Sequence, residues 1–180
     1  TPVTIENTGW VTGATDSASV TLVEFADFQC PACKANEPFV EQILADYPDD
    51  VKFVYKHFPL TSIHKNAEAA AVAAEAAGKQ DKFWEMHNLL FEKQAEWEGL
   101  GAGQVQDTFV SYAQSLGLNT DTFRKDLEDK ELAKKITAQQ NEGLSLGVMG
   151  TPTFFINGKR VESGSYELLK NAVESELKKK

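Results

Sequence analysis

The chain contains two cysteines, and they lie three residues apart in the segment Cys30-Pro31-Ala32-Cys33. Two thiols at this spacing can form a disulfide, because side chains three residues apart share one face of a helix. The bond would close a very small loop, so it would contribute little as a structural staple. The pair therefore indicates reversible dithiol–disulfide chemistry. The alternatives are two inert core cysteines or half of a zinc site.

The cysteine pair follows a predicted strand and opens a predicted helix. Residues 20–28 are rich in β-branched and aromatic side chains and almost continuously apolar, which is typical of a central strand. Pro31 suits the first position of a helix that ends near residue 47. Unpaired N–H groups and the helix dipole at this position would lower the pKa of Cys30. We therefore expect Cys30 to be the exposed attacking sulfur and Cys33, one turn deeper, to be the resolving thiol.

An acidic residue in the predicted strand is a candidate partner of the thiols. Strand alternation places Glu24 on the same side as Phe28. A buried carboxylate there would have a raised pKa and could exchange protons with Cys33. The alternative is a carboxylate at a sheet edge that pairs with a lysine. Asp27 lies on the other face and nearer to the loop, so it ranks below Glu24.

A late proline is a candidate for substrate binding. Thr151-Pro152 precedes the strand-like residues 153–156, and a proline can stand in a strand only at an edge or at its first residue. If the peptide bond is cis, the backbone of Thr151 would be presented outward, where an extended substrate chain can pair with it. If the bond is trans, the segment is an ordinary turn.

The three histidines lack the paired spacing of a zinc site. His57 ends a strand, His64 opens a helix and His87 lies within a helix among aromatic residues. We therefore expect each of them to be packed or solvated, and we predict neither a metal nor a cofactor.

The rest of the chain predicts an α/β fold with an all-helical insertion. Residues 51–58 form a second strand, and strand–helix–strand implies a right-handed parallel crossover. An alanine-rich helix then ends at Gly78 as its C-terminal cap, and helical signals continue to about residue 147. Strands around the turn Asn157-Gly158 and a final helix complete a ββα unit. The predicted domains are 1–62 with 148–180, and 63–147.

Composition limits the partners. With 180 residues and 42% hydrophobic side chains, the chain can form one domain or a domain with a large insertion. Its net charge of -9 argues against nucleic acid and anionic membrane surfaces, which would repel it. No run approaches the ~20 apolar residues of a membrane span. Thr1-Pro2-Val3 lacks an initiating Met and a signal peptide, so we expect a processed or trimmed chain.

Four segments together carry a family resemblance. They are Val23-Glu24-Phe25 before Phe28-Gln29-Cys30-Pro31-Ala32-Cys33, then Lys56-His57-Phe58-Pro59-Leu60, then Lys82-Phe83-Trp84-Glu85-Met86-His87 after the alanine-rich helix, and finally Gly150-Thr151-Pro152-Thr153-Phe154-Phe155-Ile156-Asn157-Gly158. In this combination the chain resembles the DsbA-like thiol:disulfide oxidoreductases, over nearly its whole length beyond residues 1–19.

The resemblance implies a thioredoxin fold (βαβ…ββα) with an inserted helical domain. It implies Cys30 as nucleophile, Cys33 as resolving thiol and Pro152 as a cis-proline that faces them, and Glu24 matches the buried acid of the family. Pro31-Ala32 departs from the Pro-His of the strongly oxidising members, so an imidazole that would stabilise a thiolate is missing.

The resemblance also implies a place in the cell and a set of partners. The protein would be exported and would work outside the cytoplasm of a bacterium, as in the periplasm. There it would oxidise thiols of unfolded or partly folded proteins and would itself be reoxidised by a membrane quinone-linked protein. We expect a disulfide oxidase that acts as a monomer. An isomerase or reductase is the main alternative, although residues 1–19 are too short and polar for a dimerisation segment. A redox-inactive binding or metal-carrier module is the second alternative function.

Overall fold

The computed structural model describes residues 1–179, and these divide into two compact units. The sheet unit comprises residues 1–26, 31–58 and 139–179. The helical unit comprises residues 27–30 and 59–138. The short loop 27–30 therefore belongs to the helical unit, although the strand before it and the helix after it belong to the sheet unit.

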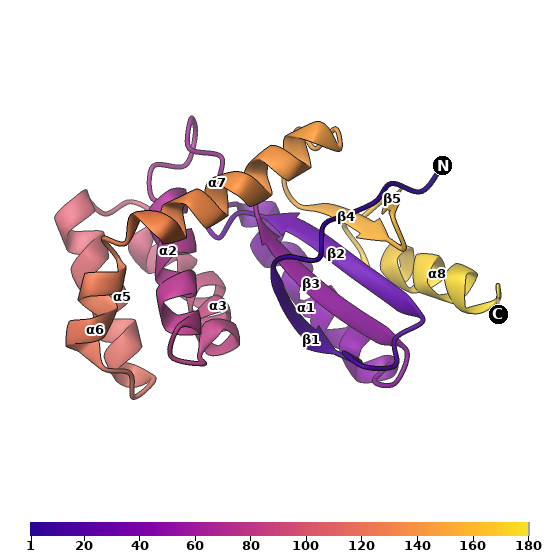
Figure 1. The fold of residues 1–180 in the computed structure, drawn as a ribbon, viewed down its shortest axis with the longest axis horizontal. Coiled ribbons are helices and arrows are strands. Elements are labelled where there is room, and N and C mark those ends of the chain that lie inside the picture. The colour runs from indigo at the N-terminus through magenta and orange to yellow at the C-terminus, as the bar shows by residue number, and fades with distance from the viewer. Residues whose placement is uncertain (180) are drawn as a thin grey trace. The chain divides into compact units, whose positions relative to one another are not determined.

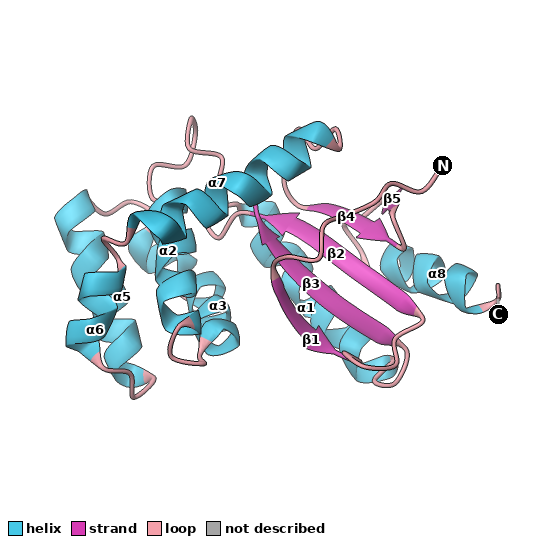
Figure 2. Ribbon diagram, viewed as in Figure 1, coloured by secondary structure: helices cyan, strands magenta, loops and turns pink. Residues whose placement is uncertain are grey.

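A five-stranded mixed sheet forms the centre of the sheet unit (Figure 2). Its strands are β1 (Trp10–Gly13), β2 (Val20–Ala26), β3 (Val51–His57), β4 (Thr153–Ile156) and β5 (Lys159–Val161), in the order β1-β3-β2-β4-β5. β2 and β3 are parallel, as the strand–helix–strand pattern predicts, and the other neighbours are antiparallel. β2 lies between β3 and β4 and is almost wholly buried, which explains its nearly continuous apolar sequence.

Helices cover both faces of this sheet. α1 (Pro31–Asp46) lies behind the sheet in the view of Figure 1 and packs against α8 (Tyr166–Leu177). The last residues of α7 (Lys130–Ser145) cover the opposite face. Gly143 brings α7 very close to the sheet there, because a Cβ at this position would lie 2.8 Å from the Phe58 ring and 3.0 Å from the Phe25 ring.

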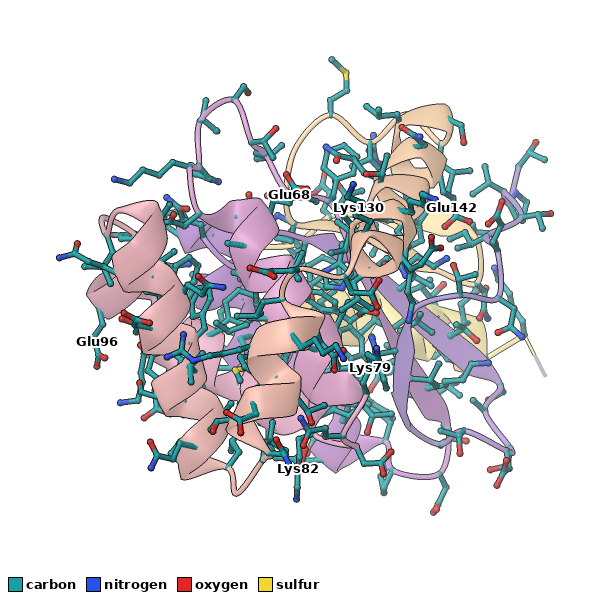
Figure 3. All side chains as sticks on the ribbon, turned by 60° about the vertical axis from the view of Figure 1, so that its left-hand side comes forward. Glu68, Lys79, Lys82, Glu96, Lys130 and Glu142 are labelled. Atoms are coloured by element: carbon teal, nitrogen blue, oxygen red, sulfur yellow. The ribbon has the colours of Figure 1, made fainter. Side chains whose placement is uncertain are left out.

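A buried ion pair fastens α7 to the sheet. Lys56 Nζ lies 2.6 Å from Glu142 Oε1, and the two side chains are 0% and 6% exposed. Glu142 projects from α7 in Figure 3. Lys56 Nζ also donates to the Glu6 carbonyl and to Thr8 Oγ1, so residues 6–8 bind the lysine of the ion pair. All three groups that bind Lys56 accept hydrogen bonds, which compensates for removing its ammonium from water.

The helical unit consists of α2 (Ala67–Gly78), α3 (Phe83–Glu92), α4 (Gln94–Trp97), α5 (Ala102–Ser115), α6 (Thr120–Asp126) and the first part of α7. The alanine-rich α2 is almost entirely buried and packs against α3 and α5, because its small side chains let neighbouring helices approach closely. Lys79, labelled in Figure 3, follows α2 and binds Asp126 and Asp129 at 3.0 and 3.4 Å.

Several predicted boundaries need correction. β2 ends at Ala26 and not at Phe28, and Gly78 is the last helical residue of α2 instead of a cap beyond it. Along the chain the two compact units change at 58/59 and 138/139, which differs from the predicted domain boundaries at 62/63 and 147/148, and those stay predictions. The reason for the second difference is that α7 continues without a break to Ser145, and its last residues pack on the sheet.

Candidate active site

The loop before Cys30 is a tight turn. β2 ends at Ala26, and the N–H of Cys30 donates to the Asp27 carbonyl at 3.0 Å. The Phe28 ring packs on α3, with its centroid 5.0 Å from that of Phe91. The strand therefore stops early because its next residues form a turn that the helical unit holds, and this turn leads directly into α1 at Pro31, the predicted first helical residue.

The buried side chain of one glutamine and the backbone of one asparagine hold this loop. Gln94 Nε2 donates to the carbonyls of Phe28 and Cys30 at 2.7 and 3.1 Å. Gln29 Oε1 accepts from the N–H of Asn66 at 2.9 Å. Gln94 and Asn66 were not predicted site residues, because a polar residue in a helical block normally indicates a solvent-exposed face. Only their burial, at 5% exposure each, distinguishes them.

Asp27, which ranked below Glu24, anchors the loop through its carboxylate. Oδ1 accepts from the N–H of Gln29 at 2.7 Å. Oδ2 accepts from the N–H of Leu60 at 2.9 Å and lies 2.7 Å from His64 Nδ1. His64 does not open a helix as predicted, because it lies in the turn before α2.

The two cysteines differ in accessibility in the predicted order, but both are buried. Cys30 is 6% exposed and Cys33 is 0% exposed, so the expectation of an exposed Cys30 sulfur is wrong. Pro31 and Ala32 between them are exposed. The placement of the pair at the start of a helix is confirmed, and its redox roles stay predictions.

Asn36 fixes the first turns of α1. Its Nδ2 donates to the Ala32 carbonyl at 2.8 Å, and its Oδ1 accepts from the N–H of Gly164 at 2.9 Å. The side chain thus ties the segment that carries Cys33 to the loop before α8. Nothing in its spacing distinguished it from an ordinary helical asparagine.

Glu24 is completely buried in the central strand. Its ladder neighbours are Tyr55 on β3 and Phe154 on β4, so the alternative of a carboxylate at a sheet edge is wrong. The adjacent Phe25 points to the face covered by α7, so alternation directs Glu24 to the other face, where α1 lies. Because β2 ends at Ala26, strand alternation no longer relates Glu24 to Phe28, and their alignment stays a prediction.

The peptide bond between Thr151 and Pro152 is cis, so the alternative of an ordinary trans turn is wrong. Pro152 directly precedes β4, whose first residue, Thr153, is the ladder partner of Phe25. Thr151 and Pro152 are both partly exposed. The segment therefore stands at the end of the same ladder that contains Glu24, and its role in substrate binding stays a prediction.

Glu37 is a further titratable group on α1, one turn beyond Cys33. Burial, with a smaller effect of the neighbouring Glu41 charge, raises the pKa of Glu37 from 4.5 to about 8. This acid was not a predicted site residue, because its burial does not follow from helical spacing.

His57 and His87 are both buried, and the His87 ring packs against Phe28, with a centroid distance of 5.7 Å. Within residues 1–179, no group of three or more histidine, cysteine or acidic side chains could hold a metal ion. No helix in the same range is long and apolar enough to cross a membrane.

A mixed sheet covered by helices, a Cys-X-X-Cys segment at the start of its first helix and a cis-proline before β4 together define a protein of the thioredoxin class. A family model described as thioredoxin matches residues 6–175, and the chain belongs to this family. The predicted thioredoxin fold is thereby confirmed.

One relative and one solved structure match nearly the whole chain. Disulfide bond formation protein D of Bacillus subtilis is 32% identical over 173 residues, which cover 92% of this chain and 76% of that protein. The crystal structure of oxidised BdbD from Bacillus subtilis superposes with a TM-score of 0.81 at 30% identity, over 93% of this chain and 92% of the other. The predicted resemblance to DsbA-like enzymes is confirmed.

A different group of relatives consists of larger proteins. A Na(+)/H(+) antiporter, NhaA 1 of Salinispora arenicola, is 45% identical over 152 residues, which cover 84% of this chain. The match spans only 22% of the length of that antiporter. The chain thus corresponds to a small part of these curated relatives.

Proposed function

We propose that the chain is a protein disulfide oxidase that transfers a Cys30-Cys33 disulfide to the thiols of other proteins. The observation that supports this most is the Cys-X-X-Cys pair at the start of α1, in a chain similar over 92% of its length to disulfide bond formation protein D. The antiporter match does not carry ion transport over to this chain, because it spans only 22% of the antiporter.

The reaction proceeds through a mixed disulfide on Cys30. A substrate thiolate attacks the Cys30 sulfur, the bond to Cys33 breaks, and the Cys33 thiolate takes up a proton. A second substrate thiolate then attacks the substrate sulfur of the mixed disulfide, and Cys30 leaves as a thiolate. The substrate loses two electrons and gains a disulfide, while the Cys30-Cys33 pair gains two electrons and becomes a dithiol.

The environment of each cysteine suits its role. Cys30 precedes α1 directly, so the N–H groups and dipole of the helix stabilise its thiolate as a leaving group. Cys33 is the more deeply buried of the two and therefore resolves the mixed disulfide instead of starting it. Glu24, on the face covered by α1, exchanges the proton that Cys33 takes up.

The segment Thr151-Pro152 binds the substrate chain in this proposal. It is partly exposed at the start of β4, where an extended segment can form backbone hydrogen bonds beside the sheet. The substrates are unfolded or partly folded thiol-containing proteins outside the cytoplasm. A membrane quinone-linked protein reoxidises the chain, which acts as a monomer.

Trapping tests the proposal. Because Cys33→Ala removes the resolving thiol, the variant should accumulate mixed disulfides through Cys30 when it is oxidised with glutathione and mixed with a reduced, unfolded substrate. Cys30→Ala is the matched control and should form none. If Cys33→Ala forms no mixed disulfide and Cys30 is unreactive near neutral pH, the enzyme proposal is wrong.

The reduction potential separates the oxidase from its closest alternative. An oxidase should lie near about -120 mV in a glutathione buffer, whereas a thioredoxin-like reductase lies near about -270 mV. A value at the lower end would replace oxidase with reductase as the proposed activity.

A further inference from the structure

We propose that His64 is a positioning residue, which acts through the Asp27 carboxylate to keep Cys30 reactive. The inference deepens the proposed function, because it takes Cys30 as the attacking sulfur. It concerns residues of the helical unit alone, since Asp27, Cys30 and His64 all belong to that unit.

The Asp27 carboxylate shapes the residues just before Cys30. Its Oδ1 accepts from the N–H of Gln29 at 2.7 Å, while the Asp27 carbonyl accepts from the N–H of Cys30 at 3.0 Å. Backbone and side chain of one aspartate thus hold two successive N–H groups. A change in the position of this carboxylate will therefore change the position of Cys30, because one short turn joins the two residues.

The second carboxylate oxygen ties this turn to the chain that follows β3. Asp27 Oδ2 accepts from the N–H of Leu60 at 2.9 Å and lies 2.7 Å from His64 Nδ1. We assign the proton of this contact to Nδ1 of His64, because a carboxylate oxygen accepts hydrogen bonds and does not donate them. His64 is therefore the side-chain donor to the oxygen that joins the two segments.

The charge of Asp27 links its contact with His64 to the reactivity of the Cys30 thiol. The Asp27 side chain is 0% exposed, so water does not screen its charge. It belongs to a turn that ends at Cys30, where a negative charge opposes the formation of a thiolate. The His64 N–H withdraws charge from the carboxylate and holds it in place, and loss of this donor should disfavour the Cys30 thiolate.

The His64 side chain is 16% exposed and therefore mostly buried, so each replacement needs a check of folding stability beside the reactivity measurement. His64→Ala removes the donor. His64→Asn is the conservative variant, because its amide nitrogen is bonded to Cγ as Nδ1 is in histidine and can donate to the same carboxylate oxygen. The neighbouring Lys65 is exposed and binds the Gly99 carbonyl at 2.9 Å, so Lys65→Gln removes a nearby charge without touching Asp27.

The experiment measures the rate of alkylation of Cys30 by iodoacetamide between pH 4 and 9, in a Cys33→Ala background. His64→Ala should lower the rate at acidic pH about fivefold to tenfold and raise the apparent pKa of Cys30, since a tenfold loss of thiolate corresponds to one pKa unit. His64→Asn should restore the rate to within about twofold, and Lys65→Gln should match the parent protein. Urea unfolding of each variant shows whether the fold is intact.

A double-mutant cycle tests whether His64 acts through Asp27. In an Asp27→Asn background, His64→Ala should change the alkylation rate by less than about twofold, because the carboxylate that His64 offsets is gone. The inference is overturned if His64→Ala has the parent profile, if His64→Asn is as impaired as His64→Ala, if Lys65→Gln gives the same shift, or if His64→Ala is equally effective without the Asp27 carboxylate.

Alkylation by a small reagent does not need oxidase activity. If the protein forms no mixed disulfide with substrate but its alkylation depends on His64, the proposed function is wrong and the role of His64 is supported. If the protein traps substrate but Cys30 is alkylated at the same rate in all His64 variants, the proposed function is supported and the role of His64 is wrong.

Discussion

Glu24 is a buried acid in the central strand of the sheet, with Tyr55 and Phe154 as its ladder neighbours. A carboxyl group in these surroundings can serve the thiol chemistry only by moving a proton, because it has no access to a substrate. Its proposed partner, Cys33, is also completely buried. Cys33 takes up a proton after it leaves as a thiolate, and it must lose that proton before it can attack a mixed disulfide at Cys30, so both steps need this proton transfer.

Glu24→Gln should therefore slow the attack of Cys33 on a mixed disulfide at Cys30 by about tenfold or more and change its pH dependence. The release of glutathione from a Cys30-glutathione adduct between pH 5 and 9 measures this step. Glu162→Gln is the control, because Glu162 is an exposed acid of the same unit. An unchanged pH profile in Glu24→Gln would remove Glu24 from the mechanism.

Glu37 gives a pH dependence of stability. Burial raises the pKa of this carboxyl to about 8 in the folded protein from 4.5. Between these two values the folded chain holds a proton that the unfolded chain has lost, so the free energy of unfolding falls as the pH rises. Below pH 4.5 both states are protonated and the contribution vanishes.

Glu37→Gln should remove this loss, because a glutamine has no proton to release. Relative to the parent protein, the variant should gain about 1–3 kcal/mol at pH 8 and little at pH 4. Urea unfolding at both pH values measures the difference. Glu41→Gln should give a smaller gain, because the Glu41 charge is the lesser cause of the shift. An equal gain at both pH values would contradict the titration of Glu37 as the cause.

Prediction from the sequence worked best for residues whose role is local. The spacing predicted that Pro31 begins a helix directly after Cys30, and Asn157-Gly158 forms the expected turn with positive φ at both residues. The hydrogen bonds of Asp27, Gln94 and His64 could not be predicted, because the bonded partners lie 33 to 66 positions apart in the chain. Only the fold brings such residues together.

At the scale of elements, α7 shows how a glycine can serve packing instead of flexibility. Gly143 lies within the helix, where alanine is normally the better residue by about 1 kcal/mol. A Cβ here would lie 2.8 Å from the Phe58 ring and 3.0 Å from the Phe25 ring, closer than such contacts normally come. The clash outweighs the helix propensity, since the two rings pack edge to face in the core.

Gly143→Ala should therefore destabilise the protein by about 1–3 kcal/mol in urea unfolding. Gly103 on α5 is the matched control, because nothing lies within 4 Å of the Cβ that an alanine would add. Gly103→Ala should stabilise the protein by up to about 1 kcal/mol through helix propensity alone. If both variants were stabilised, the close approach of α7 to the sheet would be wrong.

Element types could be predicted from periodicity, whereas their ends could not. β2 ends two residues before its apolar run ends, because Asp27 starts a turn that helical-unit side chains hold. α7 passes beyond the observed unit boundary at 138/139 and continues to Ser145, because its last residues bury their packing surface on the sheet. In both cases a contact distant in sequence decides where a locally favourable element stops.

For the whole molecule, the direction of electron flow is linked to stability. An unfolded Cys-X-X-Cys chain has no surroundings that favour either redox form. The folded chain changes the potential only by stabilising one form more than the other, so the potential and the folding free energies belong to one thermodynamic cycle. Each 30 mV by which folding raises the potential corresponds to about 1.4 kcal/mol of extra stability in the reduced form.

The proposed oxidase should therefore be more stable reduced than oxidised. The contacts of Gln94 and Asp27 hold the turn before Cys30 by its backbone and do not depend on a bond to Cys33. The start of α1 further stabilises the Cys30 thiolate of the reduced form. Urea unfolding with and without dithiothreitol should show a higher midpoint for the reduced protein, and a Cys30→Ala, Cys33→Ala double variant should show no dependence on the reductant. A reductase would show the opposite order, because its disulfide form is the one that folding favours.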